Sequence, residues 1–236
     1  MSTFTAAAPD LRASATAGKQ TIAVDVLLSL GAALVSLRLA GPLLRSHHYA
    51  WAGGVLALAA ATATMAWGTA HGWDDRSFRI WYLAGALLSA PLLGIGSLSL
   101  WGRRWAAPVG LLYTGLAVGI AAVMPVHGTF ASTSVPHAQD HVDALPRIVA
   151  IVGSSLGTIA VVVVAVATMK QRRLGNWLLL GAVAAAGAAS ALTQTAVGAA
   201  AACFALAAVL LYASANLPVG SPRVDSAAAA PPNVSR

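Results

Sequence analysis

The stretch RIVAIVGSSLGTIAVVVVAVAT, residues 147–168, is apolar except for small hydroxyl residues and one arginine at its start. A run of about 20 predominantly apolar residues is long enough to cross ~30 Å of hydrocarbon as an α-helix. Six more runs of this kind lie at 22–44, 50–70, 79–100, 106–125, 175–192 and 195–215. The sequence therefore predicts an all-α fold, a bundle of seven transmembrane helices over residues 22–215.

Composition supports a membrane protein. Hydrophobic residues make up 58% of the 236 residues and charged residues 9%, whereas soluble domains carry about 25% charged residues. A mean hydropathy of +0.75 is too high for a surface that faces water. The chain length allows one bundle with short loops and no second folded domain. The net charge of +7 resides at the ends of the apolar runs, which favours orientation in a lipid bilayer and argues against a nucleic-acid partner.

The two ends of the chain are polar and rich in small residues. We expect residues 1–21 to form a disordered arm and residues 216–236 a disordered tail. A cleavable signal peptide is the alternative for the N-terminus, since Arg12 and Lys19 precede an apolar run. That run exceeds the usual core of about 7–15 residues, so we interpret it as a retained first span.

The distribution of Lys and Arg predicts an orientation. One side of the predicted bundle carries nine basic residues, namely Arg38, Arg45, Arg103, Arg104, Lys170, Arg172, Arg173, Arg223 and Arg236. The other side carries five, namely Arg12, Lys19, Arg76, Arg79 and Arg147. The positive-inside rule places the first side in the cytoplasm, hence the N-terminus outside and the C-terminus inside. Abundant Ala and Gly with no Glu are typical of a GC-rich bacterial genome, so we expect a bacterial plasma membrane.

Small residues predict how the helices pack, because close backbone approach replaces the hydrophobic effect inside lipid. Gly115-x-x-x-Gly119 and Gly153-x-x-x-Gly157 are the direct matches to this pattern. Pro91 lies in the middle of the third span, where it removes a backbone hydrogen bond and predicts a kink.

Charged residues within the spans are few. Asp25 lies about one turn inside the first span, and Arg79 lies at the same predicted depth in the third. An Asp25–Arg79 ion pair would lower the cost of burying both groups. The alternative is two separate interfacial charges that reach water on their own.

The histidines supply the one pattern with metal-ligand spacing. The predicted outer loop HGTFASTSVPHAQDHVD, residues 127–143, holds His127, His137, Asp140 and His141. Zinc or copper needs several such ligands to converge. The loop lacks an HExxH motif and paired cysteines, and its Ser, Thr, Pro and Gly content favours mobility. We therefore expect no cofactor, with a zinc or copper site as the alternative.

Two families with seven spans are excluded by the residues they require. Retinal proteins need a lysine in the seventh span, and the lysines here are Lys19 and Lys170. Seven-span metal hydrolases of the ceramidase and adiponectin-receptor type carry histidines in the last span, and residues 195–215 contain none.

One stretch of about 50 residues resembles a known group. Gly72-Trp73, the run FRIWYLAG at 78–85 and the run LLGIGS at 92–97 resemble a pattern in uncharacterised multi-span membrane proteins of Gram-positive, actinobacterial type. The resemblance implies no activity. It directs attention to a rim formed by Trp73, Arg79, Trp81 and Tyr82, for which an aromatic belt with a snorkelling arginine is the structural alternative.

The leading hypothesis is a multi-pass membrane protein that binds a small apolar or amphipathic ligand, or a membrane-protein partner, without catalysis. A metal-dependent membrane enzyme with a His/Asp site at its outer face is the alternative. A transporter half is disfavoured, because seven spans do not divide into two equal inverted repeats.

Overall fold

The computed structural model describes residues 11–130, 135–193 and 195–217, and every regular element within them is a helix. The elements are α1 (Leu11–Arg45), α2 (Tyr49–His71), α3 (Asp75–Trp81), the π-helix η1 (Tyr82–Ser89), α4 (Ala90–Leu100), α5 (Ala106–Val123), α6 (Ala138–His141), α7 (Ala144–Ala167), α8 (Arg173–Leu192) and α9 (Val197–Asn216). Because α3, η1 and α4 follow one another without a break, they form one rod.

Seven helices, with α3, η1 and α4 counted as one, are long and apolar enough to cross a membrane, which confirms the seven predicted segments. The surface between their ends is also strongly apolar. Leu111 and Leu112 are each 76% exposed, and Val123 is 80% exposed. A soluble monomer rarely exposes a continuous apolar surface of this kind, whereas a lipid-facing surface requires one.

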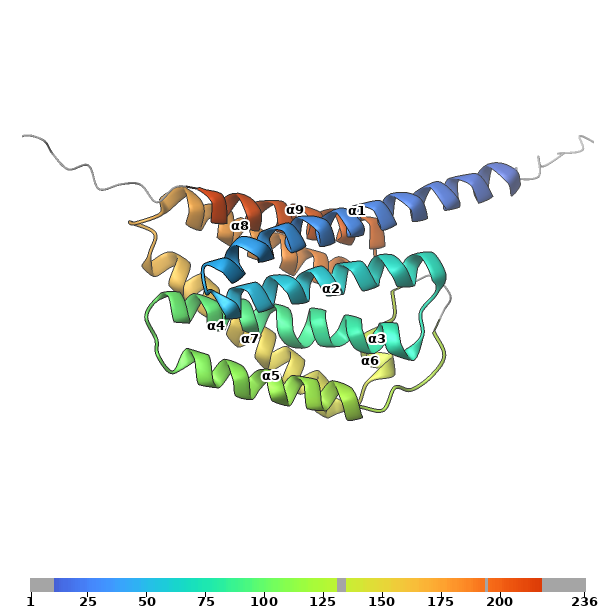
Figure 1. Cartoon of the computed structure of the whole chain (residues 1–236). Coiled ribbons are helices and arrows are strands. Elements are labelled where there is room, and N and C mark those ends of the chain that lie inside the picture. Colours follow the sequence, from blue (N-terminus) through green and yellow to red (C-terminus); the bar gives the residue numbers. More distant parts are fainter. Residues whose placement is uncertain (1–10, 131–134, 194, 218–236) are drawn as a thin grey trace, which may run out of the picture.

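The helices lie side by side in two groups. In Figure 1, α1, α8 and α9 lie along one side of the bundle, and α2, α4, α5 and α7 lie along the other. Extensive packing joins α1 to both α2 and α9, while α7 packs mainly on α4 and contacts α8 sparingly. The bundle is therefore a ring that closes weakly between α7 and α8.

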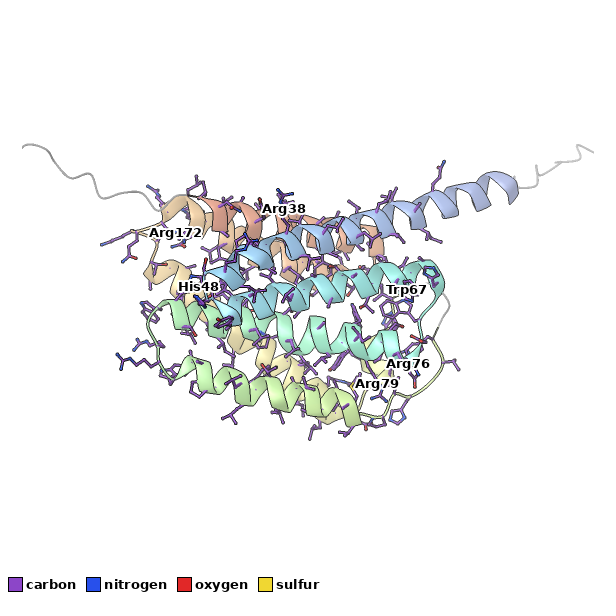
Figure 2. The ribbon with its side chains drawn as sticks, viewed as in Figure 1. Arg38, His48, Trp67, Arg76, Arg79 and Arg172 are labelled. Atoms are coloured by element: carbon purple, nitrogen blue, oxygen red, sulfur yellow. The ribbon has the colours of Figure 1, made fainter. Side chains whose placement is uncertain are left out.

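The two ends of the bundle differ in chemistry. Arg172 and His48 lie at one end, where α1 ends and α2 begins, and Arg76, Arg79 and Trp67 lie at the opposite end (Figure 2). We call the first the basic end. The second, which carries the connection 124–143 between α5 and α7, is the loop end.

Part of the predicted N-terminal arm is helical. Helix α1 begins at Leu11, so residues 11–21 of that arm belong to this helix. The segment after Leu11 contains Ala, Arg, Lys and Gln, which are good helix formers, and it continues a helix already nucleated by the span. Residues 1–10 and most of the predicted tail lie outside the described residues.

Pro91 explains the π-helix. The carbonyls of Leu87 and Ala86 lie four and five residues before Pro91, so they would accept its N–H in an α-helix and a π-helix respectively, and proline has none. Instead, the Tyr113 hydroxyl donates to the Leu87 oxygen and the Ser154 hydroxyl donates to the Ala86 oxygen, each at 2.8 Å. Side chains from α5 and α7 thereby satisfy both carbonyls freed in the third span, as lipid requires.

Glycines allow α4 and α7 to approach closely. A Cβ added to Gly94 would lie 2.5 Å from the Gly157 oxygen, and one added to Gly157 would collide with the backbone of Ala90 and Pro91. Gly153 leaves room for the Tyr113 hydroxyl. The other predicted pair, Gly115 and Gly119, meets no atom within 4 Å. Packing through that pair is therefore not found.

Candidate functional site

A cavity of about 770 Å³ lies between the two groups of helices. Helices α2, α7, α8 and α9 line it together with η1 and α4, and Trp81 of α3 and Ala138 of α6 also contribute. None of the described lining residues belongs to α1 or α5. Its lining is mostly Ala, Leu, Val, Ile and aromatic carbon, with no charged side chain among the described residues that form it. Small-molecule sites have this apolar character and occupy about 300–1,000 Å³.

The cavity extends along most of the bundle. At the loop end it meets Trp81, Tyr82 and, from the connection between α5 and α7, Pro136 and Ala138. At the basic end it meets Trp51, in the first turn of α2. A ligand with a long apolar part fits this elongated shape better than a compact one.

The cavity is open on one side. Ile151 and Ile159 of α7 line it, yet they are 61% and 57% exposed. Gly187 and Ser190 of α8, which face the same space, are also exposed. The opening therefore lies between α7 and α8, where the ring closes weakly, and on the apolar flank of the bundle.

Hydroxyl groups mark the cavity wall. Thr62 donates to the Leu58 oxygen at 2.9 Å, and Ser89 donates to the Gly85 oxygen at 2.6 Å. Bonds of this kind satisfy the hydroxyl within its own helix. They make the wall slightly polar without adding charge, and the engaged hydroxyls are not poised as nucleophiles.

The aromatic residues of the predicted rim have two different roles. Trp81 and Tyr82 line the cavity, and Tyr82 is only 3% exposed. Trp73 instead lies against Gly68, where an added Cβ would fall 2.5 Å from its ring. Trp73 therefore closes the turn between α2 and α3, and its interpretation as part of a ligand-binding rim is not supported by its position.

The proposed ion pair between Asp25 and Arg79 does not form. The Arg79 Nη1 atom donates to the Ala121 oxygen at 3.0 Å, and so satisfies a carbonyl at the end of α5. Asp25 faces the second residue of α9, since its Oδ1 lies 2.7 Å from the position of a Cβ on Gly198. An anion there complements the positive end of the α9 dipole. The two groups therefore face different helices, and their equal depth in the membrane stays a prediction.

The predicted metal ligands do not converge. Across the described ranges, no three His, Cys, Asp or Glu side chains lie together in a way that could hold an ion. His127 Nε2 lies 3.2 Å from the Asp143 carboxylate, and His141 Nδ1 lies 2.6 Å from the His127 carbonyl oxygen. His137 is the N-cap of the short helix α6, and Asp140 lies within that helix.

Those contacts give the connection 124–143 a structural role. Val126 and Val142 pair as an isolated β-bridge, and His141 packs against Phe78 and Phe130 with ring centroids 5.6 and 4.7 Å away. The described part of this connection is therefore folded onto the bundle, contrary to the mobility that its composition predicts. It covers the cavity at the loop end.

Several cavity residues were missed from the sequence. Ser155 and Thr158 lie in the SSLGT run of α7, and Gly187 lies in the alanine-rich α8. The spacing of hydroxyl residues at 154, 155 and 158 could have indicated a polar stripe on α7. Nothing in the sequence indicates that this stripe faces α8 across a gap.

Comparison with known proteins adds no further constraint: no protein-family model, curated protein or solved structure matches the chain. The resemblance carried by residues 72–97 stays a prediction.

Proposed function

We propose that this protein crosses the membrane seven times and holds one small apolar or amphipathic molecule in the central cavity, without catalysing a reaction on it. The observation that carries this proposal is the cavity of about 770 Å³ itself. A void of that size in a bundle with otherwise close helix contacts forfeits packing energy along its whole wall. A bound apolar molecule would restore those contacts.

The route of entry supports a ligand that arrives from lipid. The opening between α7 and α8 lies on the apolar flank, beside Ile151 and Ile159. A molecule dissolved in the bilayer would reach it without crossing water. Water-soluble ligands would have to pass the loop end, which the described part of the connection 124–143 covers.

A binding role agrees with the chemistry of the wall. The described lining residues include no Asp, Glu, Lys, Arg, His or Cys. General acid–base and nucleophilic mechanisms rely chiefly on these side chains. A metal-dependent reaction at the loop end finds no convergent ligand set in the part of the chain described.

The orientation that we propose follows the basic residues. The loop end faces the outside of a bacterial plasma membrane and the basic end faces the cytoplasm. In that orientation the covered end of the cavity lies at the outer leaflet.

Photochemical labelling tests the binding proposal. The full-length protein in lipid vesicles is irradiated with a diazirine-bearing stearyl probe, and the labelled peptides are identified by mass spectrometry. We expect saturable labelling of α7 and α8 peptides, displaced by excess unlabelled stearyl compound.

Gly187 and Gly115 provide a matched pair of variants. Both are exposed helical glycines, and neither would bring an added Cβ within 4 Å of another atom. Gly187 lines the cavity and Gly115 does not. Gly187→Leu should reduce the saturable labelling several-fold and Gly115→Leu should leave it unchanged. Equal labelling of both variants and the parent protein would overturn the proposal.

A further inference from the structure

At the loop end of the cavity, one tyrosine hydroxyl has no hydrogen-bond partner among the described residues. Tyr82 lines the cavity and is 97% buried, since only 3% of it is exposed. Within the described residues its hydroxyl makes no hydrogen bond, whereas Tyr113 on the adjacent helix bonds the Leu87 carbonyl. A hydroxyl that faces an apolar cavity without a protein partner is free to donate a hydrogen bond to a ligand there.

A positive charge lies at the same end of the bundle. Arg147 is in the first turn of α7, three residues before Ala150, which lines the cavity. Its Nη2 atom donates to the carbonyls of Gln139 and Val142. Its Nε atom is buried and has no partner in the described structure. Two carbonyl groups of the connection 124–143 therefore hold the guanidinium in place.

The charge at this end is not neutralised from within the cavity. No acidic residue lines it among the residues described. Asp143, the acidic residue nearest in sequence to Arg147, lies 3.2 Å from His127 and is exposed. Arg79, the other arginine near this end, is bonded to the end of α5.

We propose that the cavity selects an amphiphile with an anionic, oxygen-rich head, with Tyr82 as the hydrogen-bond donor to that head and Arg147 as its counter-charge. This inference rests on the proposed function and names the ligand class for the same site. The head lies at the loop end, and a single apolar chain runs towards Trp51 along α8 and α9. A carboxylate and a phosphate monoester share this head chemistry.

Competition among four single-chain amphiphiles tests the inference. Palmitate, hexadecyl phosphate, hexadecanol and hexadecylamine are each used to displace the diazirine-bearing stearyl probe from the full-length protein in vesicles. We expect the two anionic compounds to compete at lower concentration than hexadecanol, and hexadecylamine to compete least. Which of the two anions competes at lower concentration identifies the head as carboxylate or phosphate.

Variants of Tyr82 and Arg147 test which residues cause the preference for anions. Tyr82→Phe removes one hydroxyl and should raise the competing concentration of the preferred anion about tenfold, as expected for a hydrogen bond to a charged group, with little change for hexadecanol. Tyr212→Phe, on a tyrosine of α9 outside the cavity lining, is the matched control and should change neither. Arg147→Met should abolish the preference for anions and Arg147→Lys should retain part of it.

The outcomes distinguish a failure of the proposed function from a failure of the anionic-head inference. If no chain compound displaces the probe, the proposed function itself fails. If all four compete equally and Tyr82→Phe changes nothing, the cavity binds apolar chains but the anionic-head inference is refuted.

Discussion

The Tyr113 hydroxyl donates a hydrogen bond of 2.8 Å to the carbonyl oxygen of Leu87, the oxygen that Pro91 would bond if proline had an N–H. This contact joins α5 to the irregular part of the third span. Gly153 of α7 leaves the space that the hydroxyl occupies. Residues of three helices thus take part in satisfying a carbonyl that the break in the backbone hydrogen-bond pattern leaves free.

Tyr113→Phe should therefore destabilise the protein through one lost hydrogen bond. Such bonds between membrane helices contribute about 0.6 kcal/mol on average, up to ~1.7 kcal/mol. We expect a value near the upper limit, because the Leu87 carbonyl then has no partner in lipid. Unfolding in mixed micelles with increasing SDS measures this loss. In a Pro91→Ala background, where the N–H is restored, Tyr113→Phe should destabilise the protein less. An equal destabilisation in both backgrounds would contradict this role of the Tyr113 hydroxyl.

Gly157 should tolerate no side chain. A Cβ there collides with the backbone of Ala90 and Pro91, which cannot rotate away as a side chain can. We expect Gly157→Ala to destabilise the bundle by about 1–3 kcal/mol, the usual cost of overpacking. Thermal unfolding in detergent would measure the change. Gly119→Ala, at a helical glycine with open space around it, is the control and should be neutral or slightly stabilising, because alanine favours helix.

The hydrogen bonds that the Asp74 carboxylate accepts at the loop end predict that the stability of the protein depends on pH. It is the N-cap of α3, and its carboxylate accepts a hydrogen bond of 2.8 Å from the Ser77 backbone N–H. The hydrogen bonds from the Ser77 side chain and backbone lower the pKa of Asp74. A lowered folded-state pKa means that the stabilisation is present above the unfolded pKa of about 3.9 and is lost as pH falls through the folded value.

Asp74→Asn tests this linkage, because asparagine can still cap a helix but does not titrate. Melting temperatures of the parent and the variant should differ at neutral pH, with the parent higher, and should converge as the pH falls below about 4. A difference that stays constant down to the acid limit would show that the Asp74 charge contributes nothing. The effect should be small, since the group is exposed.

The spans were predictable because membrane crossing imposes a length and a composition on each helix separately. The run at 147–168, for example, became α7 at Ala144–Ala167. Local sequence was also sufficient to mark Pro91 as an irregularity, although not to reveal that the π-helix η1 accommodates it.

The helices that lie next to one another in the bundle could not be predicted in the same way. Asp25 and Arg79 were expected to pair because they share a depth, but Asp25 faces α9 and Arg79 faces the end of α5. Which helix lies beside which is decided by contacts between distant residues, such as Gly94 with Gly157. For the same reason, Trp81 and Tyr82 could be named as candidates, while the α7 and α8 residues on the other side of the cavity could not.

The orientation of the bundle is tested from the two chain ends. The nine basic residues assigned to one side against five on the other predict an external N-terminus and a cytoplasmic C-terminus. Cys203 is the one natural cysteine, so Cys203→Ser gives a background without thiols. Ser14→Cys and Ser226→Cys are then introduced separately, and intact cells are treated with a membrane-impermeant maleimide.

Ser14→Cys should react in intact cells, and Ser226→Cys should react only after the membrane is permeabilised. Labelling of Ser226→Cys from outside would reverse the orientation and would place the loop end, with Tyr82 and Arg147, at the cytoplasmic leaflet. The cavity and its opening between α7 and α8 would be unchanged by that reversal, because both are properties of the bundle alone. Only the leaflet that supplies the polar head of the ligand would differ.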